Sequence, residues 1–341
     1  MNPNLASTAK PDASLIFNEL NAFQRSAALK AAIDLDLFTL IAEGQNTAEA
    51  LATALSAPPR GVRILCDFLV MQGLLSKQGS VYANSLESSL FLNQQSPGYF
   101  GGVSRFLLDP RLMAGFHDLA QVVRTGRTTL PDQGTVSDDN PIWVEFARHM
   151  APMMFPASQD MAEVLAGRGP LRVLDLAAGH GVFGVAIAQR NPEAHVTALD
   201  WENVLAVATE NAEKMGVATR YAPLPGSAFT TDFGGPYDLV LVTNFFHHFD
   251  QATCVSLMKK VAASLAPGGR CATLDFVPNE DRVTPWASAS FAIVMLGSTV
   301  TGDAYTAAEY QAMLAEAGYT ESTFLPLAHS PETLIVSTKA S

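Results

Sequence analysis

The chain has 341 residues, which is long for a single hydrophobic core and suits two domains. Hydrophobic residues make up 48% of it, a fraction that excludes an intrinsically disordered protein. The formal net charge is −12, and no cluster of basic residues offsets it. Because such a surface repels phosphate backbones, we expect no nucleic-acid partner.

The apolar runs and the cysteine spacing further limit the class of protein. The N-terminal segment has no apolar core of the signal-peptide type, and no run of about 18 apolar residues predicts a membrane span. Cys66, Cys254 and Cys271 show no CxxC spacing, so we expect them to be reduced and buried. These patterns predict a cytoplasmic protein with no membrane partner.

Residues 1–96 are predicted to form a mostly helical domain. Apolar residues recur at helical spacing from residue 14 to residue 43, and Thr47 is placed to cap a further helix. Another helix is expected at 61–72, followed by a short hairpin at 73–83. Helices followed by a hairpin are the order of a winged-helix unit.

A winged helix can bind DNA or serve as a packing and dimerisation module. The helix before the hairpin carries only Arg60 and Arg63, against Asp67, in a strongly acidic chain. A recognition helix needs a basic face. The sequence therefore favours dimerisation over DNA binding.

The sequence pattern after residue 96 changes at about residue 169, from mostly helical to alternating strands and helices. Residues 97–168 are mostly helical in pattern, with a loop at 124–140, and we expect a helical linker and substrate-lid region. Short apolar strands then alternate with helices over 169–341. The predicted strands are 172–176, 195–199, 237–243 and 271–276, with a closing pair at 324–327 and 333–338. Such alternation predicts an α/β, Rossmann-like fold with a doubly wound, mainly parallel sheet.

A glycine-rich turn follows the first of these strands. In the segment VLDLAAGHGVFG, Gly179 and Gly181 lack a Cβ, so the backbone can turn tightly and a ligand can lie against it. Asp200 ends the next strand, 19 positions after Gly181. A carboxylate there can accept both ribose hydroxyls of an adenosine ligand.

Two cofactors with an adenosine could use this turn. The GxGxxG spacing of residues 179–184 leaves an NAD-binding oxidoreductase open. However, Asp175 lies near the end of the strand, where it would repel a pyrophosphate. S-adenosylmethionine (SAM) carries no phosphate, and its ammonium and sulfonium groups are cationic, so a nearby acid is favourable. The sequence therefore predicts SAM.

A pair of histidines follows the strand at 237–243. In an open α/β sheet, ligands bind beyond the carboxyl ends of the strands, so His247 and His248 are expected near the crevice. Methyl transfer needs an acceptor that has lost its proton, and histidine is a suitable base near neutral pH. We expect His247 to be the base and His248 to face the following helix. A metal site using His149, His247, His248 and Asp250 is a weaker alternative, and we predict no metal.

Taken together, these motifs resemble the SAM-dependent O-methyltransferases of the caffeate and hydroxyindole type, including bacterial small-molecule tailoring enzymes. The resemblance runs from about Phe17 to Lys339. It includes the N-terminal helical stretch, the segment VLDLAAGHGVFGVAIAQ, LAPGGR before a strand, and GDAYTAAEYQAMLAEAGY near the end. It implies a winged-helix-like dimerisation domain, a homodimer, and SAM as the cofactor.

The resemblance also implies roles for individual residues. His247 falls on the family's catalytic base, and Asp275 is the acid expected to orient it. Met150, Phe291 and Met295 fall on positions that clamp the acceptor, although Met295 suits plain core packing equally well. The cofactor contacts that we expect are Asp175, Gly179, Gly181, Asp200, Trp201, Ser227, Ala228, Phe229 and Asn244. The acceptor contacts that we expect are Trp143, Phe146, Met150, Met154, Phe291 and Met295.

The chain departs from the family pattern at several positions. Ser227 stands where an acid is common, Phe249 where Trp is usual, and Ala304 at the position of a second acid near the base. A base without that second acid leaves other chemistry open, namely C-methylation, with or without a metal, or a non-methylating reaction such as hydroxylation. The leading prediction is methyl transfer to a hydroxyl of a small aromatic, or otherwise flat and apolar, molecule.

Overall fold

The computed structural model describes residues 12–339, and the chain divides into two compact units between Ser104 and Arg105. The sequence analysis set its boundaries at 96/97 and 168/169. Residues 1–11 of the first predicted domain lie outside the described residues. No described helix combines the length and apolar character needed to span a membrane.

The first unit is a small helical domain with a two-stranded hairpin. Its elements are α1 Ser14–Leu20, α2 Ala22–Asp34, α3 Leu37–Ala42, α4 Ala48–Ala54, α5 Pro59–Met71, β1 Leu75–Gln78, β2 Val81–Asn84, α6 Leu86–Phe91 and η1 Gly101–Val103. Phe38, Leu51 and Leu69 are fully buried at its centre. Thr47 caps α4 as predicted, because its hydroxyl accepts the Ala50 N–H at 3.2 Å.

Two basic residues of this unit, Arg63 and Lys77, bind a carboxylate within it. Asp67 on α5 accepts Arg63 Nη1 at 2.9 Å, Lys77 Nζ at 2.5 Å and the Tyr82 hydroxyl at 2.7 Å. These hydrogen bonds lower the pKa of Asp67 to about 2, with Lys77 as the largest cause. The helix and the hairpin are thereby joined through one carboxylate.

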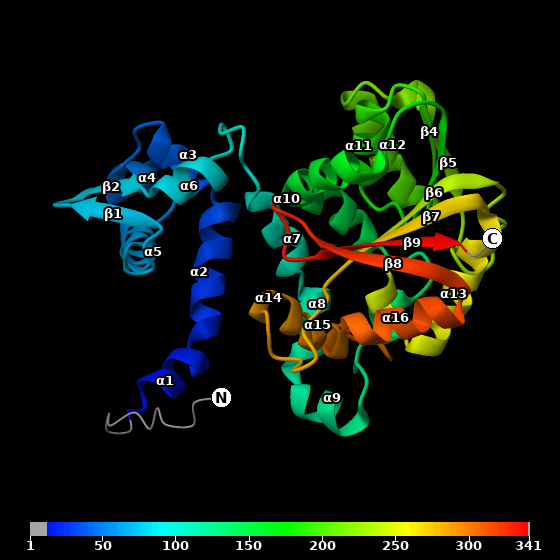
Figure 1. Cartoon of the computed structure of the whole chain (residues 1–341). Helices are drawn as coiled ribbons and strands as arrows, with labels where there is room; N and C mark the ends of the chain where they lie inside the picture. Colours follow the sequence, from blue (N-terminus) through cyan, green and yellow to red (C-terminus); the bar gives the residue numbers. More distant parts are fainter. Residues whose placement is uncertain (1–11, 340–341) are drawn as a thin grey trace, which may run out of the picture. The chain divides into compact units, whose positions relative to one another are not determined.

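The second unit is a three-layer α/β domain around a seven-stranded sheet. Its strands are β3 Leu171–Leu176, β4 Ala194–Asp200, β5 Tyr221–Pro225, β6 Tyr237–Thr243, β7 Leu265–Asp275, β8 Tyr319–Pro326 and β9 Thr333–Lys339. They are ordered β5-β4-β3-β6-β7-β9-β8 (Figure 1). The first five are parallel, β9 pairs antiparallel with β7, and β8 pairs antiparallel with β9. This confirms the predicted doubly wound sheet and its closing pair.

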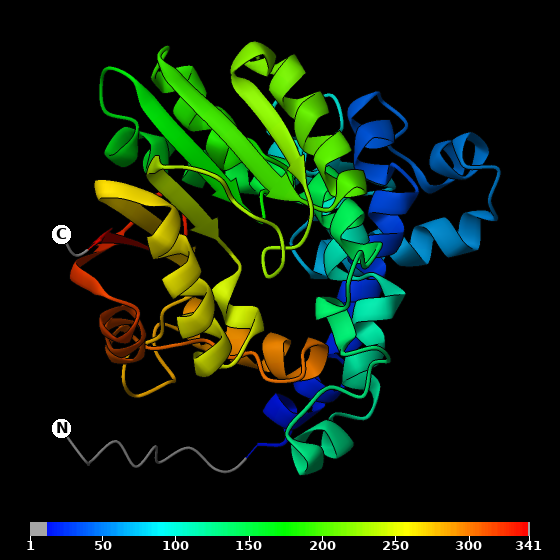
Figure 2. The same cartoon turned by 90° about the vertical axis from the view of Figure 1, so that its right-hand side faces the viewer.

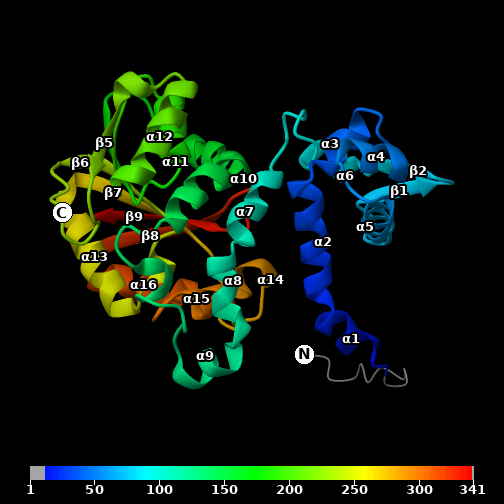
Figure 3. The same cartoon turned by 180° about the vertical axis from the view of Figure 1, so that it is seen from behind.

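Helices cover both faces of this sheet. The helices from Ser104 onward are α7 Ser104–Leu107, α8 Pro110–His117, α9 Leu119–Thr125, η2 Gly134–Val136, α10 Ile142–Leu165, α11 Val182–Arg190, α12 Glu202–Lys214, η3 Ala218–Arg220, η4 Phe246–His248, α13 Gln251–Ser264, α14 Trp286–Ala289, α15 Phe291–Ser298 and α16 Ala307–Glu316. α10, α11 and α12 pack together on one face, and α13 and α16 lie on the other (Figure 2). Seen from behind, α8 and α15 lie side by side (Figure 3).

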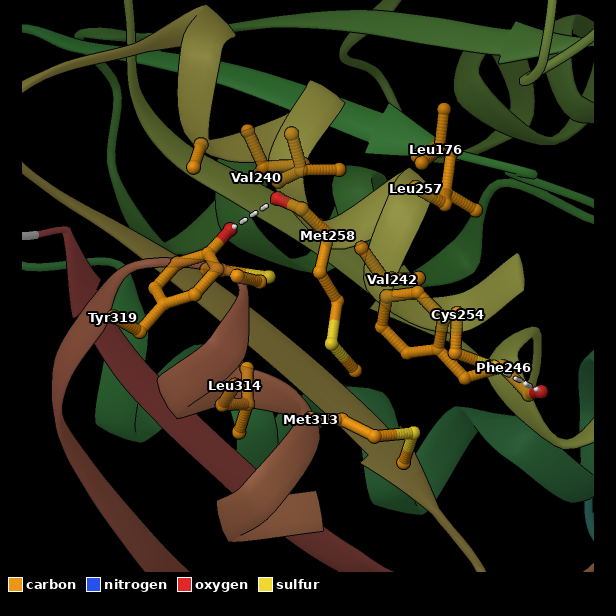
Figure 4. Packing of buried hydrophobic residues seen from close by; sticks show 14 of the residues in the cluster. Leu176, Val240, Val242, Phe246, Cys254, Leu257, Met258, Met313, Leu314 and Tyr319 are labelled. Atoms are coloured by element: carbon orange, nitrogen blue, oxygen red, sulfur yellow. Dashed lines mark hydrogen bonds between the residues drawn. The ribbon is translucent and has the colours of Figure 1, made fainter. Parts of the chain in front are cut away.

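The apolar core under α13 and α16 fixes the turn that follows β6. Val240 and Val242 of β6 pack with Met258 of α13, whose carbonyl accepts the Tyr319 hydroxyl at 3.2 Å (Figure 4). Phe246 is fully buried in this cluster, and its carbonyl accepts the Cys254 thiol at 3.2 Å. Anchoring Phe246 in this way sets the positions of the two histidines that follow it.

One strand of the sheet, β5, was not predicted from the sequence. β5 contains Pro223 and Pro225, residues that cannot donate to a strand ladder. β5 tolerates them because it is an edge strand that pairs only with β4. The three cysteines are buried and free, as predicted.

Candidate functional site

A large cavity opens where the parallel strands end. Its volume is about 710 Å³, and all of its lining residues belong to the second unit. The lining comes from the segments that follow β3, β4, β5 and β6, together with α10 and α15. The chain reverses its winding direction between β3 and β6, and ligands of doubly wound sheets bind at this point.

The turn after β3 has a left-handed backbone at both glycines, a conformation that favours glycine. Gly179 and Gly181 have φ of +56° and +73°. A Cβ on Gly181 would lie 2.5 Å from the Tyr221 hydroxyl and 2.9 Å from the Ala208 Cβ. The turn is therefore held tightly between β5 and α12, and it presents Gly179 to the cavity.

Asp200 lies on the cavity at the end of β4. One of its oxygens accepts the Gly179 N–H at 2.8 Å and the other accepts the Trp201 N–H at 2.7 Å. Burial raises the pKa of Asp200 to about 6. The carboxylate is thus fixed in orientation, and each oxygen keeps a lone pair for a ligand hydroxyl.

Asp175 lies beneath the turn and does not line the cavity. One oxygen accepts the Gly184 N–H at 3.1 Å, and burial raises its pKa to about 7. Gly181 does not line the cavity either. The other predicted cofactor contacts do, including Ser227, Ala228 and Phe229 after β5. Lys260 Nζ holds that loop by donating to three of its carbonyls, those of Ala228, Phe229 and Thr231.

His247 belongs to a buried hydrogen-bonded chain of three side chains. Its Nδ1 lies 2.6 Å from Asp275 Oδ1, and the Tyr310 hydroxyl donates to Asp275 Oδ2 at 2.6 Å. Since a carboxylate can only accept, Nδ1 carries the imidazole proton and Nε2 carries the lone pair. His247 lines the cavity, so this arrangement suits a general base.

The prediction for His248 was wrong. Its ring lines the cavity rather than facing the following helix, and it packs edge-on against Trp143 with ring centroids 5.1 Å apart. Burial, followed by the neighbouring His247, keeps the pKa of His248 well below its usual range, so it is neutral. No group of three or more His, Cys, Asp or Glu side chains suited to a metal ion occurs within residues 12–339.

The apolar wall of the cavity comes from two helices. Trp143, Phe146, Met150 and Met154 recur at spacings of three or four along α10 and all line the cavity. Phe291 and Met295 of α15 line it as well, and the Phe291 ring lies 4.7 Å from the His247 ring. The structure thus brings all six predicted acceptor contacts together on one cavity.

Comparison with known proteins decides the family. A family model described as the O-methyltransferase domain matches residues 116–320, and one described as the O-methyltransferase dimerisation domain matches residues 17–94. A crystal structure assigned as an O-methyltransferase, from Nostoc punctiforme, is 45% identical, with a TM-score of 0.94 over 97% of this chain and 100% of that one. The chain belongs to the O-methyltransferase family.

Curated relatives and other structures agree with this membership. The tetracenomycin polyketide synthesis 8-O-methyltransferase TcmO of Streptomyces glaucescens is 29% identical, over 93% of this chain and 94% of its own length. Human N-acetylserotonin methyltransferase in complex with SAM is 21% identical, and its TM-score of 0.84 over 99% of this chain shows the same fold. Membership rules out the NAD-binding oxidoreductase that the glycine spacing left open.

SAM is the cofactor of this O-methyltransferase, and the residues present fit it. Asp200 offers two oriented carboxylate oxygens, which match a ribose diol. Gly179 leaves room for a ligand beside the turn, since a Cβ there would meet only the Phe146 ring, at 3.1 Å. His180 Nε2 is buried on the cavity lining without a partner. A buried polar atom without a partner is typical of a polar ligand site. Asn244 Nδ2 is buried there as well, and its amide also interacts with the Glu332 carboxyl.

Three residues of the site escaped the sequence analysis. Tyr310 on α16 supports Asp275, and His180 in the turn lines the cavity. Glu332 does not line the cavity, but it is buried before β9, where it interacts with Asp275, Asn244 and His247. Its pKa is raised to about 7, mainly by burial. His180 and Tyr310 lie inside segments that the sequence analysis singled out, and Glu332 lies outside them. None of the three roles could be predicted, because each depends on contacts between segments that meet only in the folded domain.

Proposed function

We propose that this O-methyltransferase methylates a hydroxyl group of a small, flat, apolar molecule, with His247 as the general base. The observation that carries the proposal is the buried hydrogen-bonded chain from Tyr310 through Asp275 to His247. His247 keeps a free lone pair on Nε2 and lines a cavity with aromatic walls. Relatives named for acetylserotonin, for a tetracenomycin polyketide and for a naphthoate support a flat acceptor.

The cofactor supplies an electrophilic methyl group when it is bound, and the chain provides the rest. Asp200 is expected to hold the ribose, and Ala228 and Phe229 to flank the adenine, with Trp201, Ser227 and Asn244 as further contacts. Trp143 and Phe291 stack or clamp the acceptor. His247 Nε2 takes the acceptor proton, and Asp275 stabilises the imidazolium that forms.

On this proposal, much of the rate of methyl transfer comes from aligning the acceptor with the methyl group of the cofactor. Aromatic and methionine side chains from α10 and α15 line the acceptor side of the cavity and exclude water from it. A bound acceptor is then held in line with the transferred methyl group, and no covalent intermediate with the protein is needed. The fixed hydrogen bond between His247 and Asp275 removes the need to orient the base during each turnover.

Replacing His247 by Ala tests the base. The native enzyme is first offered a panel of hydroxylated naphthalenes and indoles, with methylated product detected by mass. His247→Ala should then lower kcat by about 10²–10⁴-fold, the usual contribution of a general base. S-adenosylhomocysteine (SAH) should bind native enzyme and variant equally by calorimetry. Unchanged turnover would remove His247 from the role, and a panel without any product would contradict the acceptor class.

We also propose a homodimer that forms through the first unit. The chain carries a dimerisation domain at residues 17–94. In the structure, α1 has no buried residue, and its apolar side chains continue onto the start of α2. The exposed apolar residues are Leu15, Ile16, Phe17, Leu20 and Phe23. Such a patch marks a protein–protein interface, and a second copy of this domain suits it.

A further inference from the structure

The cavity lacks a cationic partner for one charged group of the cofactor. SAM and SAH end in an amino acid with a carboxylate and an ammonium group. No Lys or Arg lines the cavity in the part of the chain that the structure describes; its ionisable lining residues are Asp138, Asp200 and three histidines. The carboxylate therefore needs neutral hydrogen-bond donors, and buried donors without a partner are the first candidates.

His180 is such a donor, and its tautomer follows from its contacts. The Val182 N–H donates to His180 Nδ1 at 3.3 Å, so Nδ1 holds a lone pair and Nε2 holds the proton. Burial lowers the pKa of His180 to about 3, which keeps the ring neutral. His180 Nε2 is buried and has no acceptor, and a buried N–H without an acceptor is rare.

The ring is held in one place by its neighbours. It stacks on Phe146, with centroids 5.4 Å apart and planes at 17°, and it contacts Phe183 at 5.7 Å. Its backbone carbonyl accepts the Asn211 side chain at 2.9 Å. The N–H is therefore a preorganised donor, because the ring cannot turn to another partner without losing these contacts.

Strand order places the ring near the amino-acid tail of the cofactor. Ala228 follows β5 and Asp200 ends β4, so the adenosine lies over these two strands. His247 follows β6, where the methyl group must point. The turn after β3 lies between β4 and β6, so the tail runs along this turn, which contains His180.

We propose that the His180 Nε2–H binds the carboxylate of the SAM amino-acid tail. The inference rests on the proposed placement of the cofactor at Asp200. On this proposal His180 binds the cofactor through its N–H. Its ring contacts alone would give it only a packing role. Asn244 Nδ2 is the competing donor, since it is also buried on the lining, where its amide interacts with the Glu332 carboxyl.

Calorimetry with two ligands tests the assignment. One ligand is SAH, and the other is the SAH analogue that lacks only the carboxylate. In His180→Phe the ring stack is kept and the N–H is lost, so SAH should weaken about tenfold more than the analogue does, as expected for a hydrogen bond to a charged group. Phe146→Leu disturbs the stack but keeps the N–H, and it should weaken both ligands equally.

The other outcomes overturn the assignment in distinguishable ways. Equal weakening of both ligands in His180→Phe would show that the ring only packs. A carboxylate-selective loss in Asn244→Ala but not in His180→Phe would assign the carboxylate to Asn244. Native protein that binds neither ligand would refute the cofactor placement itself.

A second measurement uses the native protein and does not depend on a variant that folds. In ¹⁵N-histidine-labelled enzyme, the ring N–H of the neutral His180 should move downfield when SAH is added. The carboxylate-free analogue should leave that signal in place. Identical spectra with the two ligands would contradict the proposal.

Discussion

At the scale of single residues, the site depends on side chains that burial holds in one protonation state. His180 and His248 are neutral because burial lowers their pKa values. The pKa of Asp200 shifts in the opposite direction, since burial raises the pKa of an acid. A proposed ligand contact with a pKa of about 6 should therefore make cofactor binding depend on pH.

The affinity for SAH should fall as pH drops below about 6. The ionised Asp200 accepts both ribose hydroxyls, and protonation removes an acceptor, so the dissociation constant should rise about tenfold for each pH unit below this pKa. Calorimetry between pH 8 and pH 5 measures the change. Asp200→Asn should bind SAH weakly and without this dependence; a native profile that stays flat would take Asp200 out of the ligand contacts.

At the scale of elements, the sequence predicted those whose patterns are local. The strand at 172–176 and its glycine turn were recognisable because the apolar run and the turn chemistry lie next to each other. β5 was missed because its two prolines are acceptable only at a sheet edge, and edge position depends on strands far away in sequence. His248 was misplaced because η4 is a single turn, too short to show a periodicity.

The residues that support His247 show the same limit of prediction from sequence. Asp275 was predicted from the family resemblance, and the structure places it 2.6 Å from His247. Tyr310 was not predicted, because it reaches Asp275 from α16, whose start is set by a capping box between Thr306 and Glu309. The family resemblance implied a second acid at the position of Ala304, which this chain lacks. The Tyr310 hydroxyl instead donates to Asp275 Oδ2, the oxygen that does not contact His247.

At the scale of the whole molecule, the exposed apolar face of α1 and α2 predicts the assembly state. Phe17 and Phe23 are 63% and 67% exposed in the single chain. The double variant Phe17→Asp, Phe23→Asp places two charges on this face and should convert a dimer to a monomer, as measured by light scattering at micromolar concentration. Lys30→Gln, a change at the half-exposed ion pair with Asp34, is the control and should leave the dimer intact. A native monomer would contradict the proposal.

The most direct test of the account is a crystal structure of the enzyme with SAH. The account predicts the ribose hydroxyls on the Asp200 carboxylate, the adenine between Ala228 and Phe229, and the sulfur facing the side of the cavity that holds His247. An SAH molecule bound away from the turn after β3, or with its sulfur turned away from His247, would contradict both the cofactor site and the assignment of the base.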